Sequence, residues 1–248
     1  RSAAGELGVG VGKERSIPGV AGDNLYELGV RYGLAIEHFA FANGLPVQLT
    51  VSRSGEIILP SRRILPANPP ADGLVVNLPE RGVFLFRNGT FDKFYPVAIG
   101  QPGRFATPTG QYELVSRVKD PTWMPPEWAG LGTDTVVPAG PDNPLGDRWM
   151  GLSMSGLGLH STTQPSSIGS AASHGCMRMY PAMSHELFDK VKVGMPVRIE
   201  YEPVKLGRDP ETGSLCLSIF PDVYGRCPLQ ARAQELLSAA GVQSWLDE

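Results

Sequence analysis

The sequence predicts a mainly β protein with a small α+β unit near its N-terminal end and a helix-containing C-terminal tail. Two observations support this fold class. Glycine and proline together supply 53 of the 248 residues, a proportion typical of a chain with many turns. Short runs of β-branched and aromatic residues recur from residue 72 onward, whereas helical periodicity is confined to a few short stretches.

Composition excludes several classes of protein. Hydrophobic residues make up 42% of the chain and charged residues 19%, which suits a packed core and not a disordered chain. The net charge of -3 argues against a nucleic-acid-binding protein, which usually has a basic face. No apolar run reaches the roughly 18 residues of a membrane-spanning helix. Because the chain begins at Arg1 without an apolar signal segment, either a targeting peptide has been removed or the chain has been trimmed.

Residues 1–16 are rich in glycine, serine and charge, and they predict a flexible leader. The compact unit that follows, residues 17–66, contains two helix signals. Asn24 begins the first helix, in a capping box with Glu27, and Gly33 ends it. The second helix places its apolar residues on one face and ends at a glycine; these positions are Ile36, Phe39, Ala40 and Gly44.

Two strands are expected to flank these helices, giving the order strand, helix, helix, strand. The run Ile57–Leu59 predicts the second strand, and a weaker signal at Ile17–Val20 predicts the first. The unit resembles a LysM domain, a module that binds N-acetylglucosamine-containing glycans. The resemblance rests on Gly22-Asp23-Asn24-Leu25, Arg31-Tyr32-Gly33, Phe41-Ala42-Asn43-Gly44 and Ile57-Ile58-Leu59-Pro60. The alternative is a small helical adaptor that only packs on its neighbour. A proline-rich linker follows at Ser61–Pro70.

Strands dominate the region 72–204. The predicted strands are Leu74–Leu78, Val83–Arg87, Phe94–Ile99, Gln111–Arg117 and Val197–Tyr201. Asn88-Gly89 between the second and third of them predicts a tight hairpin. A single helix is expected at Pro181–Lys190, with the proline in its first turn.

The C-terminal tail, residues 205–248, predicts a hairpin around Asp209–Gly213 and a final helix from Pro228 to Gly241. Cys216 and Cys227 could close a small loop in this tail. The chain has three cysteines, and an odd count fits one working thiol plus one pair. We therefore predict a disulfide between these two, with two free buried thiols as the alternative.

The residues that carry chemistry lie between Gly158 and Tyr180. His160 is followed, after 12 residues, by Ser173-His174-Gly175-Cys176. A thiol becomes a good nucleophile when a neighbouring base removes its proton, and both histidines are available for this. Gly175 lets a substrate carbonyl approach backbone N–H groups that could stabilise an oxyanion. Arg178 could form a bidentate pair with a substrate carboxylate.

Other interpretations of the same residues remain open. A lone cysteine is most often a small buried apolar residue, and Arg178 by itself could be a solvated surface charge. His160, His174 and Cys176 could also be three zinc ligands. A structural zinc needs a fourth ligand, and the other two histidines are poor candidates: His38 lies in the N-terminal unit and His185 on a helix face expected to be exposed.

The pattern His160, Ser173-His174-Gly175-Cys176 and Arg178 resembles the L,D-transpeptidase (YkuD-type) catalytic domain, in particular its ErfK/YbiS/YcfS/YnhG subgroup. The resemblance spans about residues 72–204. Flanking segments agree with it: Thr107-Pro108-Thr109-Gly110, Leu159-His160-Ser161-Thr162, Ser167-Ile168-Gly169 and Gly194-Met195-Pro196-Val197. It implies a β-sandwich-like catalytic domain, with the cysteine at a strand end under a mobile loop. Many relatives have Gly in place of Ser161 and Asn in place of Arg178.

The resemblance also implies roles for the site residues. Cys176 is expected to be the nucleophile and His160 its base. His174 and Gly175 would shape the oxyanion site together with the Cys176 N–H, and Arg178 would hold a carboxylate of the peptide stem. Ser173 and Ser161 are expected at the substrate-binding site. No metal and no organic cofactor are required, because the thiol supplies the covalent step.

By the same resemblance the substrates are peptidoglycan stem peptides on glycan strands, and the protein works in the periplasm or at the cell wall. The expected reaction is L,D-transpeptidation through a thioester, with a stem amine, a D-amino acid or a wall-anchored protein as acceptor. The loop Ser161–Ser173 and the stretch Pro121–Trp128 are long enough to wall an acceptor groove. Two alternatives are an L,D-carboxypeptidase, in which water is the acceptor, and an inactive wall-binding protein.

Overall fold

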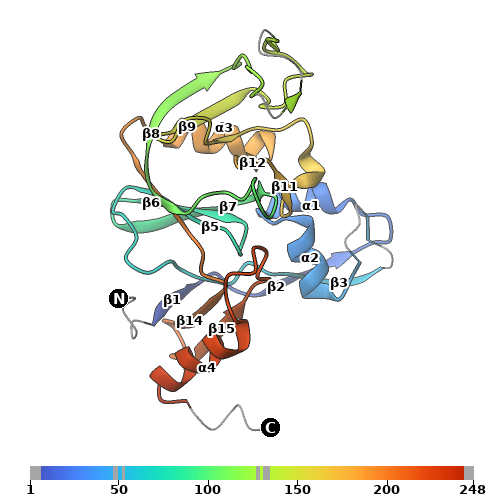
Figure 1. Ribbon diagram of the computed structural model, residues 1–248. Helices are drawn as coiled ribbons and strands as arrows, with labels where there is room; N and C mark the ends of the chain where they lie inside the picture. Colours follow the sequence, from blue (N-terminus) through green and yellow to red (C-terminus); the bar gives the residue numbers. More distant parts are fainter. Residues whose placement is uncertain (1–6, 47–49, 52–53, 127–128, 131–134, 243–248) are drawn as a thin grey trace.

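Nine strands form the main sheet of the protein, shown in the computed structural model of Figure 1. The structure describes residues 7–46, 50–51, 54–126, 129–130 and 135–242. The strands follow the order β11-β7-β12-β10-β9-β8-β13-β5-β6. Their bounds are β5 Gly73–Asn77, β6 Gly82–Arg87, β7 Thr90–Gly100, β8 Gly110–Lys119, β9 Arg148–Leu152, β10 Gly158–His160, β11 Ala171–Ser173, β12 Met177–Met179 and β13 Pro196–Glu200.

The expected mainly β fold is present, and the sheet of the β-sandwich-like domain closes on itself. β7 is 11 residues long. Its first half pairs with β6 and its second half with β12 and β11, so the pairing returns to β6 and forms a ring. Each predicted strand of this region is present. The predicted hairpin between β6 and β7 is confirmed: Asn88 and Gly89 both have positive φ, as a type I′ turn requires.

The main core lies inside this ring, and one helix covers it. Leu74, Tyr95 and Leu159 are fully buried there. The predicted helix is confirmed as α3, Pro181–Lys190, which places Leu187 in the same core and contacts β9. In the part of the chain that the structure describes, no helix is long and apolar enough to span a membrane.

The N-terminal unit has the predicted order strand, helix, helix, strand: β2 Arg15–Gly19, α1 Leu25–Tyr32, α2 Ile36–Asn43 and β3 Gly55–Leu59. The Asn24 side chain accepts hydrogen bonds from the N–H groups of Tyr26 and Glu27, so it caps α1 as predicted, but without the reciprocal Glu27 bond of the predicted capping box. Gly33 and Gly44 end the two helices in the left-handed conformation. The unit has its own core, formed by Leu25, Leu28, Leu34, Ile36, Phe39, Val51, Ile57 and Leu59.

This unit packs against the nine-stranded sheet (Figure 1). The rings of Tyr26 and Tyr180 meet edge to face, 5.4 Å apart, and Ala35 is part of the main core. Arg81, on the turn between β5 and β6, forms an ion pair with Glu37 of α2. The same guanidinium donates to the carbonyl oxygen of Gly169 at 2.7 Å. The N-terminal unit is therefore tied to the loop between β10 and β11.

The prediction of a flexible leader at residues 1–16 is wrong for residues 7–16, which the structure describes. Residues Gly8–Val11 form β1, which pairs with β4 (Arg63–Ile64) and with β14 (Val204–Arg208). Gly8 is favoured by packing, because a Cβ at this position would lie 2.4 Å from Ile64 Cγ2. Composition alone makes this stretch look like a loop, whereas the close strand contact is what selects glycine. Residues 1–6 lie outside the described residues.

The same small sheet continues into the C-terminal tail. β14 pairs with β15 (Leu215–Ile219), which confirms the predicted hairpin, and α4 (Leu229–Ala239) packs on β14 (Figure 1). The predicted disulfide is absent, since Cys216 and Cys227 are both free thiols. Cys216 sits in β15 opposite Gly207, while Asp222 accepts a hydrogen bond from the Cys227 N–H at 2.9 Å. Each cysteine is thus held by its own backbone contacts, in different parts of the tail.

A buried carboxylate joins three parts of the fold. Glu80 is 1% exposed and contacts Arg63 of β4 at 3.2 Å and Lys205 of β14 at 2.8 Å. Burial alone would raise the pKa of Glu80, but Lys205 and Arg63 together hold it below its usual value. We expect Glu80→Ala to lower the free energy of unfolding by about 3–5 kcal/mol, because it leaves two buried cations unpaired.

Urea denaturation measures this loss. The matched control is Glu235→Ala, which removes an exposed carboxylate paired with Arg232 and should cost at most about 1 kcal/mol. Equal losses in the two variants would contradict the structural importance of the Glu80 cluster.

Candidate active site

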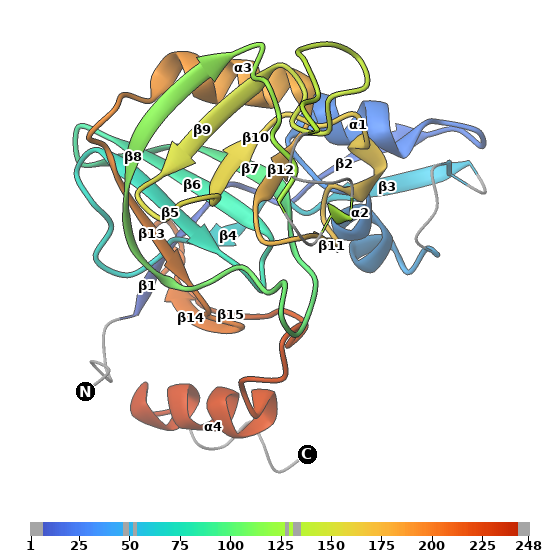
Figure 2. The same ribbon diagram turned by 45° about the horizontal axis from the view of Figure 1, so that its top comes forward.

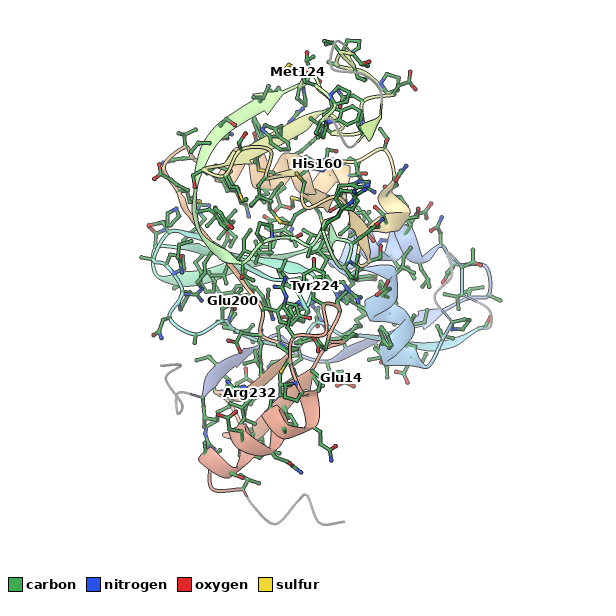
Figure 3. All side chains as sticks on the ribbon, viewed as in Figure 1. Glu14, Met124, His160, Glu200, Tyr224 and Arg232 are labelled. Carbon is green, nitrogen blue, oxygen red and sulfur yellow. The ribbon has the colours of Figure 1, made fainter. Side chains whose placement is uncertain are left out.

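A cleft of about 910 Å³ opens beside the end of β12. Its lining includes His160, His174, Cys176 and Arg178. The opposite wall comes from the β8–β9 connection, where the expected stretch contributes Pro121, Thr122, Trp123, Met124 and Pro126. Figure 3 shows Met124 on this connection, beyond His160. Trp128 lies outside the described residues. Of the loop 161–173, only Ser173 is among the described lining residues, so this loop does not form the expected second wall.

Strand pairing brings the residues of this site together. β10 and β12 are parallel neighbours, with His160 opposite Arg178 and Leu159 opposite Met177 (Figure 2). Side chains alternate along a strand, and Leu159 and Met177 are fully buried in the core. His160 and Arg178 therefore face the other side, toward the cleft. Cys176 comes two residues before Arg178 and lines the same cleft.

Cys176 is half-buried, and its thiol is neutral at rest. The Sγ donates a hydrogen bond to the carbonyl oxygen of Gly156 at 3.1 Å. Burial raises the pKa of the Cys176 thiol to about 11, although Arg178 acts in the opposite direction. Gly175, just before it, has a φ of +119°, a conformation that L side chains rarely adopt. The thiol therefore needs a base in the reaction.

His160 can be that base. It is 4% exposed, and its Nδ1 lies 2.5 Å from the carbonyl oxygen of Ser161. A carbonyl only accepts, so the Ser161 contact favours the tautomer with the proton on Nδ1 and the lone pair on Nε2; the ring also has a hydrogen bond with the Leu145 backbone. Burial lowers the pKa of His160 to about 4, and the nearby Arg178 charge adds to the effect. The imidazole is therefore neutral near pH 7.

The two predicted serines have structural roles in this arrangement. Ser161 is 1% exposed, and its contribution is the carbonyl that orients His160. Ser173 is 2% exposed. Its hydroxyl donates to the carbonyl oxygen of Cys176 at 2.5 Å and accepts from the N–H of Gly175 at 3.2 Å. Ser173 thus ties the turn together, and the Gly175 N–H is already engaged.

Arg178 and His174 lie at the rim of the cleft. Arg178 donates to the side-chain oxygen of Gln164 at 3.0 Å. The ring of His174 is exposed and meets Phe105 edge to face at 4.4 Å. Partial burial, then the charges of Arg178 and Arg104, lower the pKa of His174. Within the described residues, no three His, Cys, Asp or Glu side chains are grouped so that they could hold a metal ion.

Comparison with known proteins decides the family. Residues 71–199 match the L,D-transpeptidase catalytic domain (YkuD). The chain belongs to the L,D-transpeptidase family. Probable L,D-transpeptidase ErfK/SrfK of Salmonella typhimurium is 35% identical over 79% of this chain and 65% of its own length. Probable L,D-transpeptidase YcfS of Escherichia coli is 32% identical over 66% of this chain and 55% of its own.

The chain therefore spans about 55–65% of the length of those two relatives. Among solved structures, an L,D-transpeptidase of Enterococcus faecium with the substitution C442S is 22% identical. The structural match covers 53% of this chain and 50% of the Enterococcus faecium chain, with a TM-score of 0.41.

Three contacts at the candidate site were not predictable from the sequence. Gln164 contacts Arg178, as described above. Thr107 belongs to a flanking segment of the family pattern, and in the structure its hydroxyl donates to the carbonyl oxygen of Gly175 at 2.8 Å. Tyr224, in the C-terminal tail, accepts a hydrogen bond from the Thr107 N–H at 3.1 Å. No local pattern signals such contacts, because their partners lie far apart in the chain.

The protonation states of Cys176 and His160 predict a pH profile for the reaction of the thiol. His160 must be neutral to accept the thiol proton, so activity should fall as the pH drops through the pKa of about 4. We expect the rate of Cys176 acylation to be independent of pH between pH 5 and 8. Stopped-flow rates of Cys176 acylation by a carbapenem-type β-lactam would measure this, with circular dichroism to verify folding. An acid limb near pH 6.5 would contradict the assignment.

Proposed function

We propose that the protein is a peptidoglycan L,D-transpeptidase that works through a thioester on Cys176. The substrate is a tetrapeptide stem, and the attacked carbonyl lies between the L-centre of diaminopimelate and the terminal D-Ala. His160 Nε2 takes the thiol proton as Sγ bonds to the carbonyl carbon. The proton then passes to the departing D-Ala amine, and the thioester remains.

The second half of the reaction uses the same two residues. The acceptor amine gives a proton to His160 as its nitrogen attacks the thioester, and the collapsing intermediate returns Cys176 as a thiol. A stem amine gives a 3-3 cross-link, and a D-amino acid or a protein lysine gives an attached product. The Cys176 N–H would stabilise the oxyanion in both halves, and Arg178 would hold a stem carboxylate.

The observation that carries this proposal is the meeting of Cys176 and His160 in one cleft with a neutral thiol and a neutral imidazole. A transferase must also bind an acceptor and exclude water from the thioester. The cleft of about 910 Å³ exceeds what a single reacting group needs. Trp123 and Met124 make one wall of this cleft apolar. An apolar wall helps to exclude water, so it supports transfer to a second stem over hydrolysis.

The test is incubation with purified disaccharide-tetrapeptide, followed by mass spectrometry. Cross-linked dimers, or exchange of the terminal D-Ala for an added D-amino acid, are the expected products. Tripeptide alone at every acceptor concentration would reassign the protein as an L,D-carboxypeptidase. Failure to label Cys176 with a carbapenem, together with no product, would indicate an inactive wall-binding protein. Because the substrate is the cell wall, we place the protein in the periplasm or at the wall.

We also propose that the N-terminal unit is a LysM domain that binds peptidoglycan glycan strands. Its order of strand, helix, helix, strand and its separate core support this. We expect a fragment of residues 15–66 to sediment with insoluble peptidoglycan in a saturable manner. The control is the remaining chain, residues 67–248. Binding only by the fragment that contains residues 72–204 would show that the unit is an adaptor.

A further inference from the structure

The turn that carries Cys176 is fixed by a residue far away in the chain. Thr107 is fully buried, and its hydroxyl donates to the carbonyl oxygen of Gly175 at 2.8 Å. A trans peptide bond is planar, so its N–H points opposite to its C=O. Holding the Gly175 carbonyl therefore also sets the direction of the Cys176 N–H. This N–H is the donor that the proposed reaction assigns to the oxyanion.

Thr107 is itself held from two sides. Its Oγ1 accepts a hydrogen bond from the Gly100 N–H at 2.8 Å. Its own N–H donates to the Tyr224 hydroxyl at 3.1 Å, and that hydroxyl donates to the Gly100 carbonyl oxygen at 2.8 Å. Tyr224 thus joins the end of β7 to the segment that contains Thr107. Figure 3 shows Tyr224 between the site around His160 and the tail that bears α4.

The tail holds Tyr224 in place with several contacts of its own. The Tyr224 N–H donates to the Tyr201 hydroxyl at 2.8 Å, and that hydroxyl donates to Asp222 at 2.5 Å. The two tyrosine rings stack with centroids 5.5 Å apart. The guanidinium of Arg226 lies 4.9 Å from the Tyr224 ring centroid and 5.4 Å from that of Tyr201. This arrangement restricts the hydroxyl to one position.

We infer that Tyr224 is a positioning residue for the catalytic turn: it fixes Thr107, and Thr107 orients the peptide that presents the Cys176 N–H. The inference rests on the proposed function, because it concerns the oxyanion of that reaction. Tyr224 lies beyond residues 71–199, which match the family. The C-terminal segment therefore completes the active site, although the matched catalytic domain ends before it.

Substitutions in the full chain test this inference with disaccharide-tetrapeptide as substrate. We expect Tyr224→Phe and Thr107→Val each to lower kcat about tenfold, less than the 10²–10³-fold loss of an oxyanion donor itself. KM should change less than about twofold, because the substrate-binding groups stay in place. Thr107→Ser keeps the hydroxyl and should restore kcat to within about threefold of the wild type. The kcat of the double variant should be no lower than that of the less active of the two single variants.

Tyr95→Phe is the matched control. It also removes a buried tyrosine hydroxyl, one that contacts Glu186 at 3.2 Å on the side of α3. This control should lower the melting temperature as much as Tyr224→Phe does and leave kcat unchanged. A wild-type kcat in Tyr224→Phe would overturn the inference. So would additive losses in the double variant, which would mean that Tyr224 does not act through Thr107.

A measurement independent of turnover separates this inference from the proposed function. Hydrogen exchange followed by mass spectrometry reports the backbone amides of residues 174–176 directly. We expect exchange there to accelerate in Tyr224→Phe and not in Tyr95→Phe. Wild-type protein that forms no acyl-enzyme would contradict the proposed function alone. Unchanged exchange in Tyr224→Phe would contradict the positioning role, whatever the activity.

Discussion

Cys176→Ala is expected to reduce turnover of the tetrapeptide by about 10⁴-fold or more, because the covalent route disappears with the thiol. The fold should persist. The side chain donates a hydrogen bond to the Gly156 carbonyl and also has a hydrogen bond with the Gly158 backbone, so its loss should cost about 1–2 kcal/mol. Turnover is measured by mass spectrometry of D-Ala release, and stability by thermal unfolding.

The chain offers matched controls for this substitution. Cys216 and Cys227 are also free and half-buried, and both lie in the C-terminal tail. Cys216→Ala and Cys227→Ala should keep wild-type turnover and should still accept a carbapenem label, whereas Cys176→Ala should not. Near-normal turnover in Cys176→Ala would rule out the whole thioester mechanism.

His160→Ala is expected to lower the acylation rate by about 10²–10⁴-fold, the usual contribution of a positioned base. The effect should be strong because the thiol has a pKa of about 11 and so is almost fully protonated at neutral pH. The Ser161 carbonyl holds His160 Nδ1, and this orientation is lost with the imidazole. Single-turnover acylation by a carbapenem measures the loss.

His185→Ala serves as the control for this second substitution. His185 lies on α3, where its Nε2 contacts Asp147 at 2.5 Å, and it is not among the cleft residues. Its loss should leave the acylation rate unchanged. In His160→Ala the remaining rate should rise with pH, because hydroxide then has to remove the thiol proton. A pH-independent rate close to that of the wild type would show that another group is the base.

The sequence predicted those parts of the site that local spacing encodes. His160, Gly175 and Cys176 belong to one motif, and strand pairing between β10 and β12 brings them to one cleft. The helix ends at Gly33 and Gly44 were also predictable, since a left-handed residue there favours glycine. These features depend on a few neighbouring residues.

Features that depend on distant partners were not predictable. The composition of Gly8–Val11 predicts a loop. The stretch is a strand because it pairs with β14 on one side and β4 on the other. Ser161 and Ser173 have the polar side chains expected at a substrate site, but the Ser161 carbonyl contacts the His160 ring and the Ser173 hydroxyl bonds to backbone groups of its own turn. Tyr224 reaches Thr107 across 117 positions, and no local pattern marks that pair.

The neutral resting state of Cys176 also bears on survival in oxidising surroundings. Peroxides and disulfides react with the thiolate, not with the thiol. With a pKa of about 11, only about one Cys176 in 10⁴ is ionised at pH 7. In the proposed mechanism this state would shield the thiol from sulfenic acid formation and from mixed disulfides until a substrate arrives and His160 takes the proton. At the proposed location in the periplasm or at the wall, the thiol would then stay reduced without a dedicated reducing partner.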